Sequence, residues 1–207
     1  MLSRKIKTAF TALSCILSGE PKELCTAVLQ GHTTQLPPDV KRAVLLDFAR
    51  RHHLKTFVET GTFHGDTLGY LSPHLDALYS IELADSFYEA ATKRFAGSKN
   101  IHLLHGDSAT RLTEVISDLS EPALLWLDAH YSAGDTARGD EDTPIVQELN
   151  LLFSNQKVKH FILIDDARDF GRDPGYPSLS YIEKVAEQNN YKYDCRFDII
   201  RLLPKIA

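Results

Sequence analysis

The chain has 207 residues, of which 43% are hydrophobic and 25% are charged. This composition is that of a globular protein and argues against extensive disorder, and the length suits one α/β domain that buries most of its apolar surface. The formal net charge of −5 offers no basic face for neutralising phosphates, so we expect no nucleic-acid partner. No run of residues is long and apolar enough to span a bilayer, so we expect no membrane partner.

The cysteines indicate a reducing compartment. Cys15, Cys25 and Cys195 are far apart and odd in number, and no C-x-x-C pair occurs. We therefore interpret them as free thiols rather than as a disulfide framework or a zinc site, and we expect a cytoplasmic protein.

Residues 1–55 predict a helical region that forms part of the same domain as the rest of the chain. Basic residues ahead of the apolar stretch 9–17 faintly resemble an export signal. Apolar residues at every third or fourth position instead favour a helix with one packed face: Leu2, Ile6, Phe10, Leu13 and Leu17. Two further helices are expected over 20–29 and 39–53, separated by a linker that two prolines interrupt.

From Thr56 onward, short apolar runs alternate with amphipathic segments. We expect strands and helices in alternation, which predicts a parallel sheet built by right-handed crossovers. The five expected strands are 56–60, 77–83, 101–107, 123–130 and 160–167. Near-continuous apolar strands are typical of a sheet that is covered on both faces.

The C-terminal segments break this alternation. A helix over 177–190 precedes two strands, 191–197 and 199–204, that are joined too tightly for a crossover. They must therefore form an antiparallel hairpin. Residues 56–207 thus predict a Rossmann-like α/β fold with a parallel core and a terminal antiparallel hairpin.

The sharpest motif is VETGTFHGDTL, residues 58–68, where a strand ends, turns at a glycine and leads into a helix. Glycine is required where the backbone turns sharply or approaches a ligand closely, and open α/β sheets bind ligands at the carboxyl ends of their strands. We therefore expect this loop to contact a cofactor. The residues concerned are Glu59, Gly61, Thr62, Phe63 and Gly65.

Acidic residues also close the next two strands. Glu82 ends the second strand, about twenty positions after the loop, where a carboxylate accepts hydrogen bonds from ribose hydroxyls. Asp107 and Ser108 follow the third strand, and the alternative role for Asp107 is that of a helix N-cap. Since a G-x-G-x-x-G pattern is absent, NAD is the weaker cofactor hypothesis.

This register resembles motif I and its following acidic positions in class I S-adenosylmethionine-dependent methyltransferases. The family pattern is E/D-x-G-x-G-x-G, and Phe63 stands here in place of the middle glycine. The resemblance implies S-adenosylmethionine as the cofactor. It also implies that Glu59 positions the loop and the methionine amino group, and that Asp107 meets the adenine amino group.

Carboxylates also follow the fourth and fifth expected strands, as Asp128 and as the pair Asp165 and Asp166. Neighbouring strands lie about 4.8 Å apart, so we expect these side chains to be close together. Clustered carboxylates repel unless a cation lies between them, and oxygen ligands favour Mg²⁺, Ca²⁺ or Mn²⁺. The alternative is that the pair forms ion pairs with Arg168 and Arg172.

The three aspartates resemble the Mg²⁺ ligands of the macrocin-type, metal-dependent sugar O-methyltransferases. This resemblance extends from Thr56 to Arg168. His130, two residues after Asp128, is the candidate general base, because an ordinary histidine pKa of about 6.5 suits removal of a hydroxyl proton. Asp128 is the second candidate catalytic residue and also borders the cofactor. A purely structural strand-end histidine is the alternative, and the long loop 131–142 is typical of a lid.

The function that follows is S-adenosylmethionine-dependent methyl transfer (EC 2.1.1.-) to a hydroxyl of a small-molecule or sugar acceptor. Two alternatives remain: a cephalosporin-hydroxylase-like or other non-methylating enzyme on the same scaffold, and a non-catalytic nucleotide-binding module. The sequence leaves open whether the protein forms a homo-oligomer.

Overall fold

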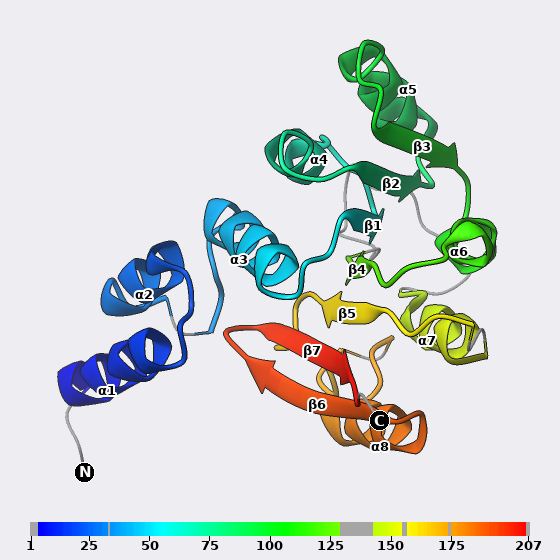
Figure 1. Cartoon of the computed structure of the whole chain (residues 1–207). Helices are drawn as coiled ribbons and strands as arrows, with labels where there is room; N and C mark the ends of the chain where they lie inside the picture. Colours follow the sequence, from blue (N-terminus) through cyan, green and yellow to red (C-terminus); the bar gives the residue numbers. More distant parts are fainter. Residues whose placement is uncertain (1–3, 33, 129–142, 155–156, 174, 206–207) are drawn as a thin grey trace.

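The computed structural model describes residues 4–32, 34–128, 143–154, 157–173 and 175–205. In chain order, its elements are α1 (Arg4–Leu17), α2 (Lys22–Leu29), α3 (Pro38–Arg51), β1 (Thr56–Thr60), α4 (Asp66–Leu71), β2 (Ala77–Glu82), α5 (Asp85–Arg94), β3 (Ile101–His105), α6 (Ser108–Asp118), β4 (Leu124–Leu127), α7 (Ile145–Ser154), β5 (Phe161–Ile164), α8 (Leu179–Gln188), β6 (Tyr191–Arg196) and β7 (Ile199–Pro204) (Figure 1). All seven expected strands are present.

The strands form a single sheet in the order β3-β2-β1-β4-β5-β7-β6. The pairs among β1 to β5 are parallel, whereas β7 runs antiparallel to both β5 and β6. The predicted Rossmann-like α/β sheet with its terminal antiparallel hairpin is therefore confirmed. In this topology the carboxyl ends of β1 to β5 share one edge, where ligands bind in open α/β sheets.

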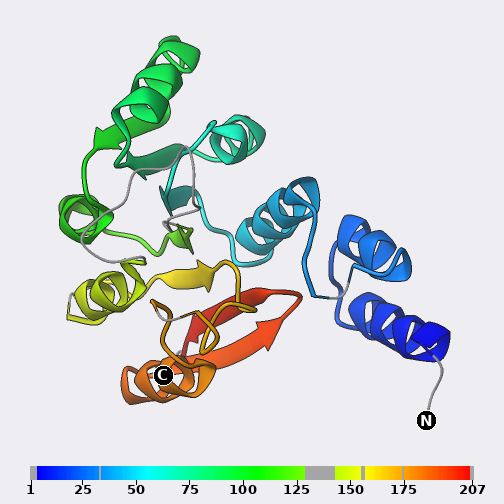
Figure 2. The same cartoon turned by 180° about the vertical axis from the view of Figure 1, so that it is seen from behind.

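Helices cover both faces of the sheet (Figures 1 and 2). One face carries α3, α4 and α5, and the opposite face carries α6, α7 and α8. Successive strand residues pack alternately into the two layers, as the two-residue period of a strand requires. Phe57 and Leu124 belong to the core under the first face, whereas Val58 and Leu125 belong to the core under the second.

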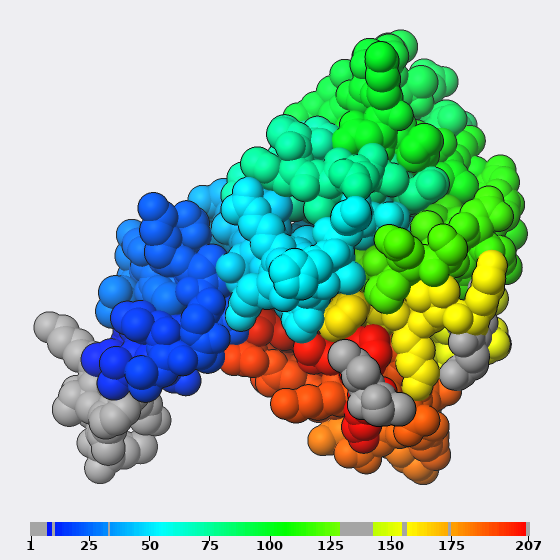
Figure 3. Space-filling model, viewed as in Figure 1, coloured from blue at the N-terminus to red at the C-terminus, as the bar shows by residue number. Residues whose placement is uncertain are grey.

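The N-terminal helices α1 and α2 form a lobe beside α3 (Figure 3). The predicted helix at the N-terminus is present, but the prediction that Leu13 and Leu17 belong to its packed face is wrong; the side chains of Leu2, Ile6 and Phe10 lie outside the described residues. Leu13 is 51% exposed and Leu17 is 79% exposed, while the smaller Ala12 and Cys15 are buried. Because α1 packs against α2, the small residues allow the two helices to approach closely. No helix among the described residues has the length and apolarity that a bilayer crossing requires.

A buried ion pair joins the turn between α1 and α2 to the last strand. Arg201 Nη1 in β7 donates to Glu20 Oε1 at 2.7 Å, and Arg196 Nη1 lies 3.3 Å from the same oxygen. The side chains of Glu20 and Arg201 are only 1% and 4% exposed. Removing one partner of a buried pair leaves an uncompensated charge, so this contact fixes the N-terminal lobe against the C-terminal hairpin.

Candidate functional site

The predicted cofactor loop, residues 61–65, leaves β1 through a sharp turn. Gly61 has a φ of +87°, and its N–H donates to the carbonyl of Ile81 in β2 at 2.9 Å. Phe63 also has a positive φ, of 49°, and its ring is 47% exposed. Gly65 is the left-handed residue that immediately precedes α4. The predicted strand–loop–helix unit is therefore present at the carboxyl edge of the sheet.

Gly65 has no room for a side chain. A Cβ built there would lie 2.7 Å from Cε2 of Phe95, and the φ of +73° strains any L-residue. We expect Gly65→Ala to lower the free energy of unfolding by about 1–3 kcal/mol, the usual cost of such backbone strain. Urea unfolding of Gly65→Ala and of Gly97→Ala measures this, since nothing lies within 4 Å of the second position. Equal stability of the two variants would contradict the interpretation.

Glu82 fixes the loop from the end of β2. Its Oε2 accepts the N–H of Phe63 at 2.8 Å, and its Oε1 accepts the N–H of Ala84 at 2.9 Å. A carboxylate offers about four lone-pair positions, so two backbone donors leave acceptor capacity for a ligand. Glu82 thus holds the backbone of the cofactor loop and can still accept hydrogen bonds from a diol.

Glu59 lies beneath the loop and is 2% exposed. Ser80 Oγ donates to Glu59 Oε1 at 2.8 Å, and the hydroxyls of Thr62 and Ser80 are hydrogen-bonded at 2.6 Å. Burial raises the pKa of Glu59 well above its ordinary value, with smaller contributions from the charges of Asp128 and Glu82 and an opposing one from Ser80. The Glu59–Ser80–Thr62 chain therefore supports the loop from below.

Asp107 stands at the N-cap position of α6, but its side chain makes no capping hydrogen bond. Asp107 thus has the position of a helix N-cap, but its half-buried carboxylate does not act as one. Ser108 follows it and is buried. Because β1, β2 and β3 are adjacent and parallel, the structure brings the loop, Glu82 and Asp107 to one edge of the sheet.

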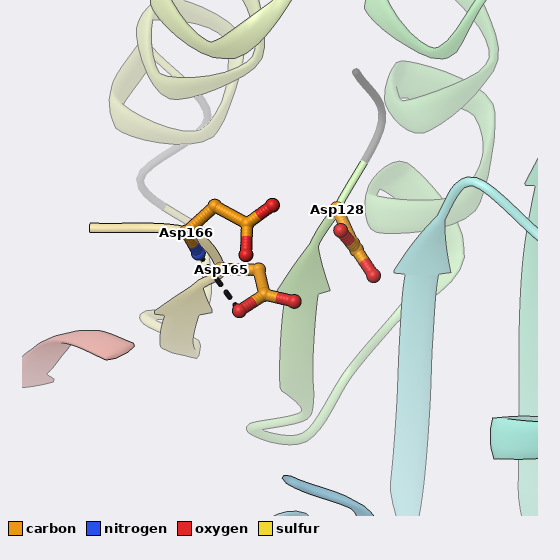
Figure 4. A group of neighbouring side chains, drawn as sticks. All are labelled: Asp128, Asp165 and Asp166. Atoms are coloured by element: carbon orange, nitrogen blue, oxygen red, sulfur yellow. Dashed lines mark hydrogen bonds between the residues drawn. The ribbon is translucent and has the colours of Figure 1, made fainter. Parts of the chain in front are cut away.

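The three aspartates after β4 and β5 also meet, as predicted. In Figure 4, Asp128 lies at the end of β4, beside Asp165 and Asp166 at the end of β5. One carboxylate oxygen from each lies within 4.8 Å of the others. The N–H of Asp166 donates to Asp165 Oδ1 at 2.7 Å, and Asp166 has a φ of +53°. This tight turn aims two consecutive side chains at the same space.

Two cationic side chains lie against this cluster. Lys41 Nζ, from α3, is 2.6 and 2.7 Å from the two carboxylate oxygens of Asp165 and 3.1 Å from Asp166 Oδ1. Arg168 Nη1 donates to Asp166 Oδ1 at 2.6 Å and also pairs with Asp198. The predicted alternative, an ion pair between the aspartate pair and Arg168, is therefore observed for Asp166. Among the described residues, no ion pair joins the cluster to Arg172.

The electrostatics of the cluster follow from burial. Burial is the main reason that the pKa of Asp165 is raised well above its ordinary value. The negative charges of Asp128 and Asp166 raise it further, and the positive charge of Lys41 lowers it. Burial acts to lower the pKa of Lys41, but Asp165 and Asp166 together raise it above its ordinary value. The oxygen donors suit Mg²⁺ in kind, but the ammonium of Lys41 lies among them, so this arrangement does not fit a metal ion as it stands.

An acidic residue that the sequence did not single out lies behind this edge. Glu148, in α7, is 1% exposed. Its pKa is raised to about 7, chiefly by burial, although the hydroxyls of Ser108 and Thr60 favour the charged form. Oε1 has no hydrogen-bond partner among the described residues. A pattern could have identified it, since Glu148 falls on the buried stripe of α7 with Ile145 and Leu149.

Glu148 also lines a pocket at the carboxyl ends of β4 and β5, whose walls are otherwise mainly apolar and aromatic. The lining residues are Leu127, Asp128, Thr143, Ile145, Glu148, Ile164, Asp165, Phe170 and Tyr176. None of them carries a basic side chain, so the pocket presents three carboxyl groups to whatever enters it. Such walls favour a neutral or cationic molecule over an anionic one.

His130, the predicted base, lies outside the described residues, as do Tyr131, Asp135, Arg138 and Asp142 of the predicted lid. Asp128, which precedes them, is described and lines the pocket. The proposed role of His130 therefore stays a prediction.

No family model and no curated protein matches the sequence. Solved structures do match the fold. A Staphylococcus aureus protein assigned as a caffeoyl-CoA O-methyltransferase is 13% identical, with a TM-score of 0.60 over 96% of this chain and 99% of that one. An O-methyltransferase from Bacillus cereus in complex with S-adenosylhomocysteine is 13% identical, with a TM-score of 0.55 over 95% and 90%.

A third solved structure points the same way. A methyltransferase of Podospora anserina with bound S-adenosylhomocysteine is 12% identical, with a TM-score of 0.59 over 83% of this chain and 80% of that one. At these identities the likeness concerns the arrangement of the backbone. Together with the strand order and the terminal hairpin, it shows that the chain has the Rossmann-like fold of class I methyltransferases.

Proposed function

We propose that this protein is an S-adenosylmethionine-dependent methyltransferase that methylates a hydroxyl of a small molecule or sugar. One observation carries the proposal: the glycine turn, Glu82 and Asp107 stand at the ends of three adjacent parallel strands. That edge is the ligand-binding edge of an open α/β sheet. Solved structures of the same fold hold S-adenosylhomocysteine, the demethylated product.

Each residue then has a defined task in binding. Glu82 keeps acceptor capacity for the ribose hydroxyls while it holds the backbone of Phe63. Asp107, whose carboxylate does not cap its helix, accepts from the adenine amino group. Glu59 and its chain of hydroxyls support the loop beneath the methionine end.

The transfer itself requires positioning more than covalent catalysis. S-adenosylmethionine, when bound, supplies a methyl group on a sulfonium. With the cofactor held by Glu59, Glu82 and Asp107, an acceptor hydroxyl in the pocket beside Asp128 would be placed to receive the methyl group, and His130 would take up the hydroxyl proton. Asp128 lines the same pocket and orients the acceptor by accepting a hydrogen bond from a neighbouring polar group of that molecule. No step passes through a metal ion.

Cofactor binding provides the first test. We expect calorimetry to show binding of S-adenosylmethionine and S-adenosylhomocysteine, and Glu82→Ala to weaken it by about 1–3 kcal/mol, the cost of leaving buried polar groups unpaired. Glu89→Ala, an exposed position on α5, is the matched control. Failure to bind either compound, or tight NAD binding instead, would refute the proposal. Binding without turnover on any hydroxyl acceptor would identify a nucleotide-binding module.

A further inference from the structure

Lys41 brings a cation from outside the Rossmann core into the carboxylate cluster. It stands in the first turns of α3, 124 residues away from Asp165 in the sequence. Its side chain is 15% exposed, and that of Asp165 is 7% exposed. The ammonium has three N–H donors and three short oxygen contacts, two to Asp165 and one to Asp166. Its hydrogen-bonding capacity is thus fully used inside the cluster.

A divalent ion would compete with Lys41 for both carboxylate oxygens of Asp165. Metal–oxygen distances are about 2.0–2.1 Å for Mg²⁺ and about 2.3–2.6 Å for Ca²⁺. An ion at those distances from the Asp165 oxygens would compete for the space beside them that the Lys41 nitrogen occupies. The displaced ammonium would then lie half-buried beside a divalent cation, and like charges at short range repel strongly in a poorly hydrated environment.

Electrostatics also explain why a cation is needed at all. Asp128, Asp165 and Asp166 offer oxygens within 4.8 Å of one another, and uncompensated carboxylates this close repel. Arg168 forms an ion pair with Asp166, but it also forms one with Asp198. Among the described residues, Lys41 is therefore the cation that balances Asp165.

We propose that Lys41 is the resident cation of this carboxylate cluster, in the place where a divalent metal ion would otherwise lie, and that the site holds no such ion. Its role is positioning: it holds Asp165 and Asp166 in place beside Asp128 at the floor of the acceptor pocket. The proposal rests on the contacts of Lys41 and would stand even if the transferred group or the acceptor were different.

A manganese titration tests it directly. Free Mn²⁺ is followed by its electron paramagnetic resonance signal during titration of the wild type, Lys41→Met, Lys41→Met/Asp165→Asn and the control Lys184→Met, which alters an exposed lysine on α8. We expect no saturable binding by the wild type or the control. Lys41→Met should bind Mn²⁺ saturably, at least about tenfold more tightly than the weakest binding that the wild-type titration could have detected, equivalent to about 1.4 kcal/mol. The added Asp165→Asn change should abolish that gain.

Several outcomes would overturn the proposal. Saturable Mn²⁺ binding by the wild type that Asp165→Asn abolishes would show that a metal displaces Lys41. A folded Lys41→Met protein with no gain in affinity would show that the lysine does not occupy a metal's place. Lys41→Arg, which keeps a cation, serves if Lys41→Met does not fold, and it should still exclude Mn²⁺. Calorimetry with S-adenosylmethionine on the same proteins reports separately on the proposed function.

Discussion

Glu148→Gln is expected to stabilise the protein at pH 8 by roughly 3 kcal/mol and at pH 5 by less than about 1 kcal/mol. The carboxyl has an ordinary pKa of 4.5 and a pKa of about 7 in the fold, mainly because it is buried. Below pH 4.5 it is protonated in both states and contributes no difference. Between these values the unfolded chain loses the proton and the folded one keeps it, so stability falls as pH rises. Above pH 7 the penalty is complete, and glutamine does not incur it.

Urea unfolding at the two pH values measures this difference. Glu187→Gln, at an exposed position on α8, is the control and should change stability by less than about 0.5 kcal/mol at either pH. A loss of stability at pH 8, or an equal gain at both pH values, would show that Glu148 is not a destabilising buried acid. A residue that costs stability at neutral pH and lines a pocket is typical of a functional site. We therefore expect the stabilised variant to be a poorer enzyme.

His130→Ala is expected to slow methyl transfer by about 10²–10⁴-fold, the usual loss when a general base is removed. The affinity for S-adenosylmethionine should stay close to that of the wild type, because the cofactor residues belong to β1, β2 and β3 whereas His130 follows β4. The pH profile should lose its histidine-like limb. Initial rates of S-adenosylhomocysteine release, with calorimetry of the cofactor alongside, provide both readouts.

The control for that experiment is His32→Ala, an exposed histidine after α2. Its rate and its pH profile should match those of the wild type. Full activity of His130→Ala would mean that another group takes the hydroxyl proton, and Asp128→Asn would then be the next variant to measure. A loss of cofactor affinity in His130→Ala would instead assign the histidine to the binding site.

The sheet could be predicted because its pattern is local. Short, near-continuous apolar runs such as 161–164 that alternate with amphipathic segments are typical of strands buried on both faces, and the short link between β6 and β7 permits only a hairpin. The face of α1 could not be predicted in the same way. Its leucines are spaced as a packed stripe, yet Leu17 is 79% exposed, because the partner helix α2 packs on the small residues instead. Periodicity identifies a helix, but the neighbours decide which side is buried.

The residues of the site differ in the same way: some are marked by the local sequence, and others are placed only by tertiary packing. Glu82 and Asp107 were predicted because each directly follows an apolar strand, and chain order then fixes their place at the edge of the sheet. Lys41 lies among ordinary helix residues, and nothing local marks it as a partner of Asp165. Only the packing of α3 on the sheet brings the two together. Glu148 did carry a signal, as the one acid on the apolar face of its helix.

β7 completes the sheet after all the other strands have been made. It is the last described element of the chain, yet it lies between β5 and β6 and is the only strand with which β6 pairs in the described sheet. Until it leaves the ribosome, β5 keeps an unpaired edge, which is the kind of surface through which nascent chains aggregate. Its Arg201 also supplies the buried partner of Glu20, made far earlier. The ion pair that anchors α1 and α2 can therefore form only after β7 has been made, so co-translational folding of this domain cannot be complete before β7 has emerged.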